Sequence, residues 1–188
     1  MICSSSQFLL DAVFKAGGRT FKTTYEKKVV ANERDPVIST RAEGSLKSKA
    51  VYFVPWKPSS NEDKLRQSLE QLVENVIQQA AREKYQTIAF PAIGCGGYGC
   101  STSVIAKTLT NQCQQLLAKY SVSILFTIQP GKTDIYNEFR RYIDTLNLGN
   151  INLKEPPISL SIDNGAIEVK KGDITKQKVK NKHLIVIN

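Results

Sequence analysis

The sequence predicts a three-layer α/β fold, in which helices cover both faces of a mixed, largely parallel sheet. Apolar, strand-like segments alternate along the chain with amphipathic helical segments. One strand runs into a glycine-rich loop and then a helix, and 188 residues, 41% of them hydrophobic, can bury one good core. Because strands separated by helices usually run parallel, the alternation predicts a sheet that is buried on both sides.

The first half of the chain alternates between predicted helices and a predicted strand. We expect a helix over residues 8–14 and a strand over Lys47–Val54, which Pro55 closes. The next segment, Asn61–Arg82, has the apolar spacing of a long amphipathic helix. The face of this helix that we expect to be core consists of Leu65, Leu69, Leu72, Val73, Val76, Ile77 and Ala80.

The middle of the chain continues the same pattern. A buried strand over residues 87–90 is followed by a helix over 101–120, a strand over 122–128 and a helix over 133–146. In sheets of this kind, ligands bind at the carboxyl ends of the strands. The loop after residue 90 lies at such an end, so we expect the site there.

That loop, residues 90–101, reads Phe-Pro-Ala-Ile-Gly-Cys-Gly-Gly-Tyr-Gly-Cys-Ser and carries the strongest functional signal in the sequence. The glycines around its tyrosine are Gly94, Gly96, Gly97 and Gly99. They free the backbone to take positive φ and expose N–H groups, and Ser101 or Thr102 can cap the helix that follows. We expect an anionic ligand, a phosphate above all. The alternative is a tight strand-to-helix turn without a ligand.

Cysteine usage and hydropathy narrow the class of protein. The four cysteines, with a single histidine in the chain, show no paired zinc spacing, so we expect no metal and reduced thiols. No apolar run is long enough to cross a membrane, and the N-terminus lacks the order of a signal peptide. We therefore expect a cytoplasmic or nuclear protein with no membrane partner.

The charge of the chain raises the question of nucleic acid. A net charge of +9 and a pI near 9.4 favour polyanionic partners. The lysines, however, fall in scattered pairs such as Lys27-Lys28 and Lys170-Lys171, without interleaved aromatic residues. Nucleic acid is therefore a secondary partner in this interpretation.

The C-terminal part changes character after a linker expected over residues 147–157. Two short strand-like segments, 158–162 and 166–170, flank a glycine-containing turn and predict a β-hairpin. After the hairpin come Gly-Asp-Ile-Thr at 172–175 and an apolar strand at 184–187.

Two of these motifs resemble those of the macrodomain family. Residues 91–99 fit the family's Pro-Ala-Ile-Gly-(Thr/Ser/Cys)-Gly-x-(Tyr/Phe)-Gly loop at every position, and the C-terminal hairpin, Gly-Asp-Ile-Thr and apolar strand resemble its opening elements. The resemblance implies that Asp173 accepts a hydrogen bond from the adenine amino group of ADP-ribose, while the Ile174 N–H reaches a ring nitrogen and Tyr98 packs on the distal ribose. The loop residues implied to wrap the diphosphate and this ribose are Ile93, Gly94, Cys95, Gly96, Gly97, Tyr98 and Gly99.

The family's first elements therefore stand last in this chain. Either the domain is circularly permuted, or the chain is a fragment of a tandem array like those beside ADP-ribosyltransferase domains. In both cases we expect residues 158–188 to fold back onto a body at 1–146. In a permuted domain they complete the same domain, and in a tandem array they start a second repeat. About 31 residues are too few to hold a core alone, and the body would otherwise expose a sheet edge.

Other positions favour a binding module over an enzyme. Hydrolytic macrodomains carry an asparagine and then glycines where this chain has Cys3 and Ser4-Ser-Ser-Gln7. We expect Cys3 and Ser4 to contact the ligand, with no catalytic residue. Gln129 stands with Ile128 and Pro130 where the family packs a side chain on adenine, and none of these three residues is aromatic. Trp56 is expected to form a wall of the cleft or a surface cap.

The leading function is thus a reader of ADP-ribose or mono-ADP-ribosylated protein, with ADP-ribose as ligand and no cofactor. Two alternatives stay open. One is a weak hydrolase of ADP-ribosyl esters. The other is a degenerate macrodomain that serves as a nucleic-acid or protein contact surface.

Overall fold

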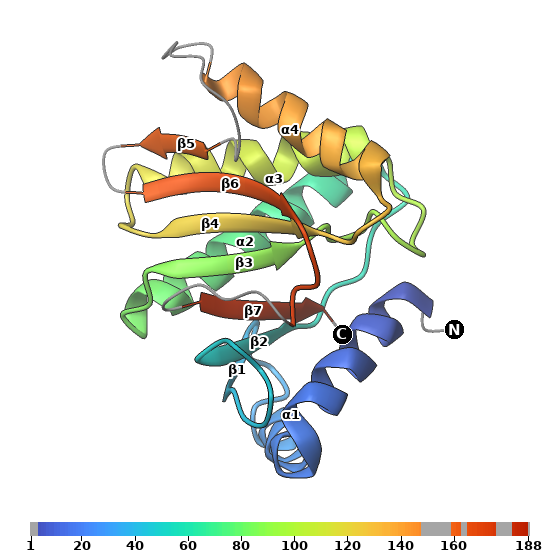
Figure 1. The fold of residues 1–188 in the computed structure, drawn as a ribbon, viewed down its shortest axis with the longest axis vertical. Coiled ribbons are helices and arrows are strands. Elements are labelled where there is room, and N and C mark those ends of the chain that lie inside the picture. Colours follow the sequence, from blue (N-terminus) through green and yellow to red (C-terminus); the bar gives the residue numbers. More distant parts are fainter. Residues whose placement is uncertain (1–3, 148–158, 163–164, 176–181, 188) are drawn as a thin grey trace.

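A computed structural model describes residues 4–147, 159–162, 165–175 and 182–187 of the chain. Within these ranges, the strands form one seven-stranded sheet in the order β1-β2-β7-β3-β4-β6-β5 (Figure 1). The elements are α1 Ser4–Ala31, β1 Ile38–Arg41, β2 Ala50–Val54, α2 Glu62–Arg82, β3 Thr87–Pro91, α3 Thr102–Leu117, β4 Ser123–Ile128, α4 Thr133–Asn147, β5 Ser159–Ile162, β6 Gly165–Lys171 and β7 Lys182–Ile187.

The sheet is mixed and largely parallel, as predicted. The five inner strands pair in parallel, while the edge strands β1 and β5 each pair antiparallel with their neighbour. Strand β7 lies between β2 and β3, with Leu184 opposite both Val51 and Ala89. The C-terminal apolar strand thus lies inside the sheet, beside the strand that leads into the glycine-rich loop.

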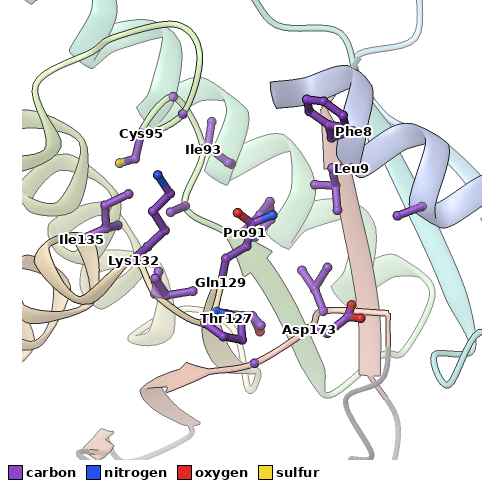
Figure 2. A pocket seen from close by; sticks show the side chains of 18 of the residues that line it. Phe8, Leu9, Pro91, Ile93, Cys95, Thr127, Gln129, Lys132, Ile135 and Asp173 are labelled. Carbon is purple, nitrogen blue, oxygen red and sulfur yellow. The ribbon is translucent and has the colours of Figure 1, made fainter. Parts of the chain in front are cut away.

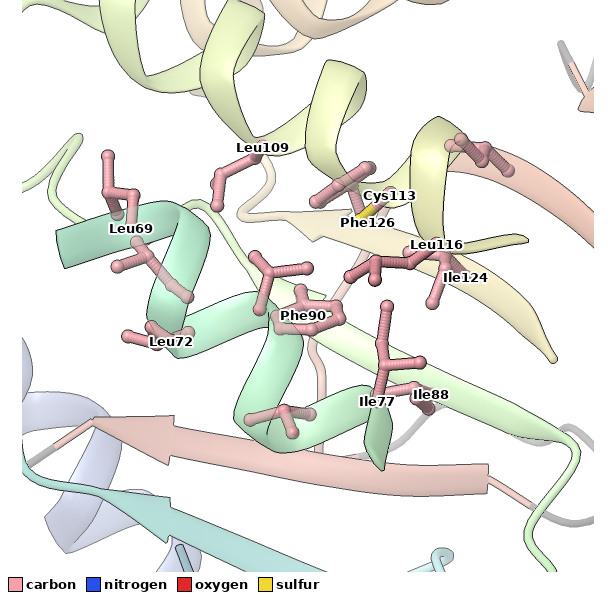
Figure 3. Close-up of a cluster of buried hydrophobic side chains, with 14 of the residues drawn as sticks. Leu69, Leu72, Ile77, Ile88, Phe90, Leu109, Cys113, Leu116, Ile124 and Phe126 are labelled. Carbon is pink, nitrogen blue, oxygen red and sulfur yellow. The ribbon is translucent and has the colours of Figure 1, made fainter. Parts of the chain in front are cut away.

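Helices α2, α3 and α4 cover one face of the sheet, and α1 covers the other, which makes the three predicted layers. All seven residues predicted for the apolar face of α2 are buried. Figure 3 shows side chains of α2, such as Leu69 and Ile77, beside Phe90 of β3 and Leu109 of α3. Ser101 caps α3 by accepting from the Val104 N–H at 3.5 Å, as expected.

The N-terminal layer differs from the prediction. The helix expected over residues 8–14 runs from Ser4 to Ala31, with a non-helical Gly18 (φ 80°) inside it. Beyond this kink, Phe21 and Tyr25 continue the apolar face and pack on Phe53 of β2. The glycine pair at 17 and 18 resembles a helix end, which hid the second half of α1.

Two strand predictions also change. Strand β1 was not predicted, because it has four residues, two of them Ser39 and Thr40, and pairs at the sheet edge. Strand β2 begins at Ala50 rather than at Lys47. The polar residues at 47–49 precede the buried part.

The C-terminal hairpin is confirmed as β5 and β6, with Leu160 opposite Ile167. Of the linker expected over 147–157, Asn147 is the last residue of α4, and the others lie outside the described residues. Among the described helices, none is both long and apolar enough to span a membrane.

Candidate functional site

A cavity of about 580 Å³ opens at the carboxyl ends of β3 and β4 (Figure 2). Five parts of the chain line it: the beginning of α1, Trp56 after β2, the loop after β3, the loop that joins β4 to α4, and the loop after β6. The cavity thus brings together segments that lie more than 80 positions apart in the sequence. Its location is the one that the parallel sheet predicts.

The glycine-rich loop forms one wall. Gly94 (φ +77°) and Gly99 (φ +64°) take positive φ, whereas Gly96 and Gly97 do not, so the expectation that all four glycines serve this purpose is wrong for those two. At Gly94 a side chain would also crowd Ile105 (3.1 Å) and the Trp56 ring (3.3 Å). Positive φ at Gly94 and Gly99 therefore shapes the two ends of the loop, and close packing also requires a glycine at position 94.

Backbone N–H groups of this loop divide into two sets. Those of Ile93, Cys95 and Gly99 donate to carbonyls within the loop, at 2.9, 3.2 and 3.0 Å. Those of Gly94 and Gly96 have no acceptor among the described residues. Gly94 is buried and Gly96 is exposed, and both amides can donate to an anion.

Trp56 forms a wall of the cavity, as expected. The residue is 7% exposed, and its indole N–H donates to Ser68 Oγ of α2 at 3.1 Å. Tyr98 meets the Trp56 ring edge-on, with ring centroids 5.9 Å apart at 87°. This contact holds the tyrosine over the cavity.

Asp173 and Ile174 line the cavity from the loop after β6. The Gly172 N–H donates to Ile128 O at 2.8 Å, which ties this loop to the end of β4. Asp173 Oδ1 accepts from the N–H (2.9 Å) and the hydroxyl (2.7 Å) of Thr175. Asp173 is thus a turn aspartate that also faces the cavity.

Most of the other predicted site residues are also at this cavity. Ile93, Gly94, Cys95, Gly96 and Gln129 line it. Gly97 and Gly99 are not among the lining residues. Cys3 lies outside the described residues, and Ser4 is the first residue of α1.

The sequence comparison identifies the family. Residues 9–109, more than half of the chain, match the profile described as Macro domain. The chain belongs to the Macro domain family. No curated protein sequence matches this macro domain.

Solved structures agree on the fold of this macro domain. An Oceanobacillus iheyensis macrodomain variant with ADPR is 18% identical at a TM-score of 0.63, with 72% of this chain and 75% of that chain covered. The Oceanobacillus iheyensis macrodomain with ADP is 18% identical at 0.60, with 75% and 76% covered. The same protein with MES bound is 17% identical at 0.61, with 75% and 77% covered.

Sequence reasoning missed several residues of the cavity. Phe8, Leu9 and Ala12 of α1 line it, and Phe8 is 71% exposed. Lys132 lines it from the loop before α4. The position of Lys132, just beyond the carboxyl end of a strand, was an available signal, whereas Phe8 gave none because an aromatic residue on a helix usually belongs to the core.

Thiol chemistry is not favoured in this macro domain. Burial raises the pKa of Cys95 to about 12; a hydrogen bond with Thr102 opposes this, and Cys100 and Asp134 add to it. Burial also raises the pKa of the Cys100 and Cys113 thiols. These cysteines stay protonated near neutral pH, and the thiolate is the nucleophilic form.

Proposed function

We propose that this macro domain is a reader of ADP-ribose or mono-ADP-ribosylated protein. One observation carries the proposal: the loop at 91–99, in which the Gly94 and Gly96 amides have no acceptor among the described residues, and Asp173 meet at one cavity although they are far apart in the sequence. The family resemblance assigns them to the two ends of ADP-ribose. Macrodomains of similar fold have been solved with ADPR and with ADP, which supports this choice of ligand.

Binding without turnover is favoured by the chemistry of the cavity. Among its described lining residues, the charged side chains are Lys132 and Asp173, and histidine is absent. General acid–base catalysis needs a group that can exchange a proton near neutral pH, and the Cys95 thiol, with a pKa of about 12, does not supply one. The side chains of Phe8 and Leu9 line the cavity just after residues 4–7, the positions at which the family resemblance implies glycines in hydrolytic relatives.

The test is retention of a modified protein. A protein mono-ADP-ribosylated on glutamate or aspartate should bind to the immobilised macro domain, and its modification should remain intact after incubation. Unmodified protein is the control for nonspecific binding to this basic chain. Release of ADP-ribose at about 1 per second or faster would establish a hydrolase instead.

We also propose that the chain is a circularly permuted macro domain, in which residues 158–188 complete the body at 1–146. The position of β7 between β2 and β3, and of β6 beside β4, supports this arrangement. In a tandem array the same segment would serve the next repeat.

A further inference from the structure

Charge in the cavity is divided between its two ends. Among the described lining residues, Asp173 carries the negative charge and Lys132 the positive charge. Figure 2 shows Lys132 on the side of Cys95 and Ile93 in the glycine-rich loop, whereas Asp173 lies on the opposite side, below Leu9 of α1. A ligand that spans the cavity therefore meets an acid at one end and a cation at the other.

The backbone of Lys132 is fixed, but its ammonium group is not engaged. Its N–H donates to Gln129 O at 3.2 Å, and its carbonyl accepts from the Tyr136 N–H at 3.1 Å, which anchors the residue at the start of α4. Within the described ranges, the Lys132 side chain has no hydrogen bond or ion pair. The ammonium is thus available to a ligand.

A neighbouring lysine shows the contrast. Lys171 Nζ donates to Thr133 Oγ1 at 3.2 Å and lies 4.8 Å from the centroid of the Tyr136 ring. Both lysines are exposed and flank the same end of α4. Lys171 is occupied by protein groups and is not among the residues that line the cavity, so it is a matched control.

The glycine-rich loop on the side of Lys132 offers only neutral backbone donors. The amides of Gly94 and Gly96 can bind phosphate oxygens, but they carry no net charge. A lysine ammonium adds a full charge and charge-assisted hydrogen bonds, which are stronger than neutral ones. A diphosphate between the loop and Lys132 would have both kinds of partner.

We propose that Lys132 binds the diphosphate of the ligand and fixes its direction in the cavity, with the base toward Asp173. The inference rests on the proposed function and adds a charge preference to it. The site selects adenine nucleotides with a diphosphate over the neutral nucleoside, and Lys132 supplies most of that discrimination.

The test compares Lys132→Gln with Lys171→Gln in the full chain. ADP-ribose and ADP are titrated by calorimetry, and adenosine by NMR, in 50 mM and 1 M NaCl. Lys132→Gln should weaken ADP-ribose and ADP by about three- to thirtyfold at low salt and leave adenosine unchanged. The loss should shrink at 1 M salt, where charges are screened beyond about 3 Å. Lys132→Arg should restore binding, and Lys171→Gln should bind as wild type.

Two results would overturn the inference alone while the proposed function stands. One is wild-type binding of ADP-ribose that Lys132→Gln leaves unchanged. The other is an equal loss for adenosine, which would mean that the substitution acts on the shape of the cavity rather than on charge. Wild-type protein that binds neither ADP-ribose nor ADP would overturn both proposals.

Discussion

Asp173 illustrates, at the scale of a residue, how one side chain can serve the fold and the site together. Its Oδ1 holds the turn after β6 through two hydrogen bonds from Thr175, and the residue also lines the cavity. A loss of binding in Asp173→Ala alone could therefore come from the turn. Separating the two roles requires a substitution that keeps the turn.

We predict that Asp173→Asn retains the turn and loses ligand affinity. The asparagine oxygen can still accept from Thr175, so the free energy of unfolding should change by less than about 0.5 kcal/mol, as for most surface changes. Loss of the charge should weaken ADP-ribose by about 1–2 kcal/mol. Urea unfolding and calorimetry measure the two quantities. Thr175→Val removes one turn hydrogen bond and keeps the Asp173 charge, so it should lower the free energy of unfolding and weaken ADP-ribose less than Asp173→Asn does.

Ionisation of buried thiols predicts how stability depends on pH. The pKa of Cys95 is raised to about 12 and that of Cys113 is also raised, so the folded chain keeps protons that the unfolded chain loses above about pH 9. The contribution of these thiols to the free energy of unfolding should therefore be constant below this pH and fall as the pH rises toward 12. Urea unfolding at pH 8 and pH 10.5 measures the change. Cys95→Ser should reduce the fall, and an equal fall in this variant would contradict the assignment to Cys95.

At the scale of elements, the β1–β2 loop braces α1 just before its kink. The Ser45 N–H donates to Ala16 O of α1 at 2.8 Å, and Gly44 (φ +62°) passes so close that a Cβ would lie 2.4 Å from the same oxygen. The loop and the helix can approach this closely only with a glycine at position 44. This contact positions α1, which in turn lines the cavity.

Gly44→Ala should therefore destabilise the protein by at least about 2 kcal/mol, because positive-φ strain adds to a backbone clash. Gly131→Ala is the control: Gly131 also has positive φ (+86°), but a Cβ there would meet nothing within 4 Å. Urea unfolding of both variants measures the difference. If the two substitutions cost the same, the packing of the loop on α1 does not matter to stability.

Elements with a strong period were predictable from the sequence, and those set by tertiary contacts were not. The apolar face of α2 and the cap of α3 follow from spacing and side-chain chemistry. The second half of α1 and strand β1 could not be predicted, since Gly18 breaks the helix period and β1 is short and partly polar. In the site, the glycine-rich loop could be predicted from the sequence, whereas Phe8 reaches the cavity only because α1 packs on one face of the sheet.

For the molecule as a whole, the C-terminal strand β7 joins the two parts of the sheet. Strand β7 separates β2 from β3 and pairs with both, so the centre of the sheet depends on residues from the end of the chain. Under the proposed circular permutation, this arrangement would let the family's elements keep their usual neighbours although their order along the chain differs.

A rearranged chain tests this proposal. If residues 158–188 are moved in front of residue 1 through a short linker, the protein should fold and bind ADP-ribose as the original does. A chain that stops at residue 147 should not fold cooperatively, because β2 and β3 would lose the strand between them. Circular dichroism and thermal unfolding distinguish these outcomes. A truncated chain as stable as the whole would contradict the permuted arrangement.

The central claim is that the cavity between the glycine-rich loop and Asp173 binds ADP-ribose. Calorimetric titration of the whole chain with ADP-ribose, beside AMP and single-stranded RNA, tests it most directly. The account predicts saturable one-to-one binding of ADP-ribose that Asp173→Asn weakens about tenfold, which corresponds to about 1.4 kcal/mol. RNA should leave that affinity unchanged when both are present. Absence of ADP-ribose binding while RNA binds would contradict the account and assign the chain to polyanion contact instead.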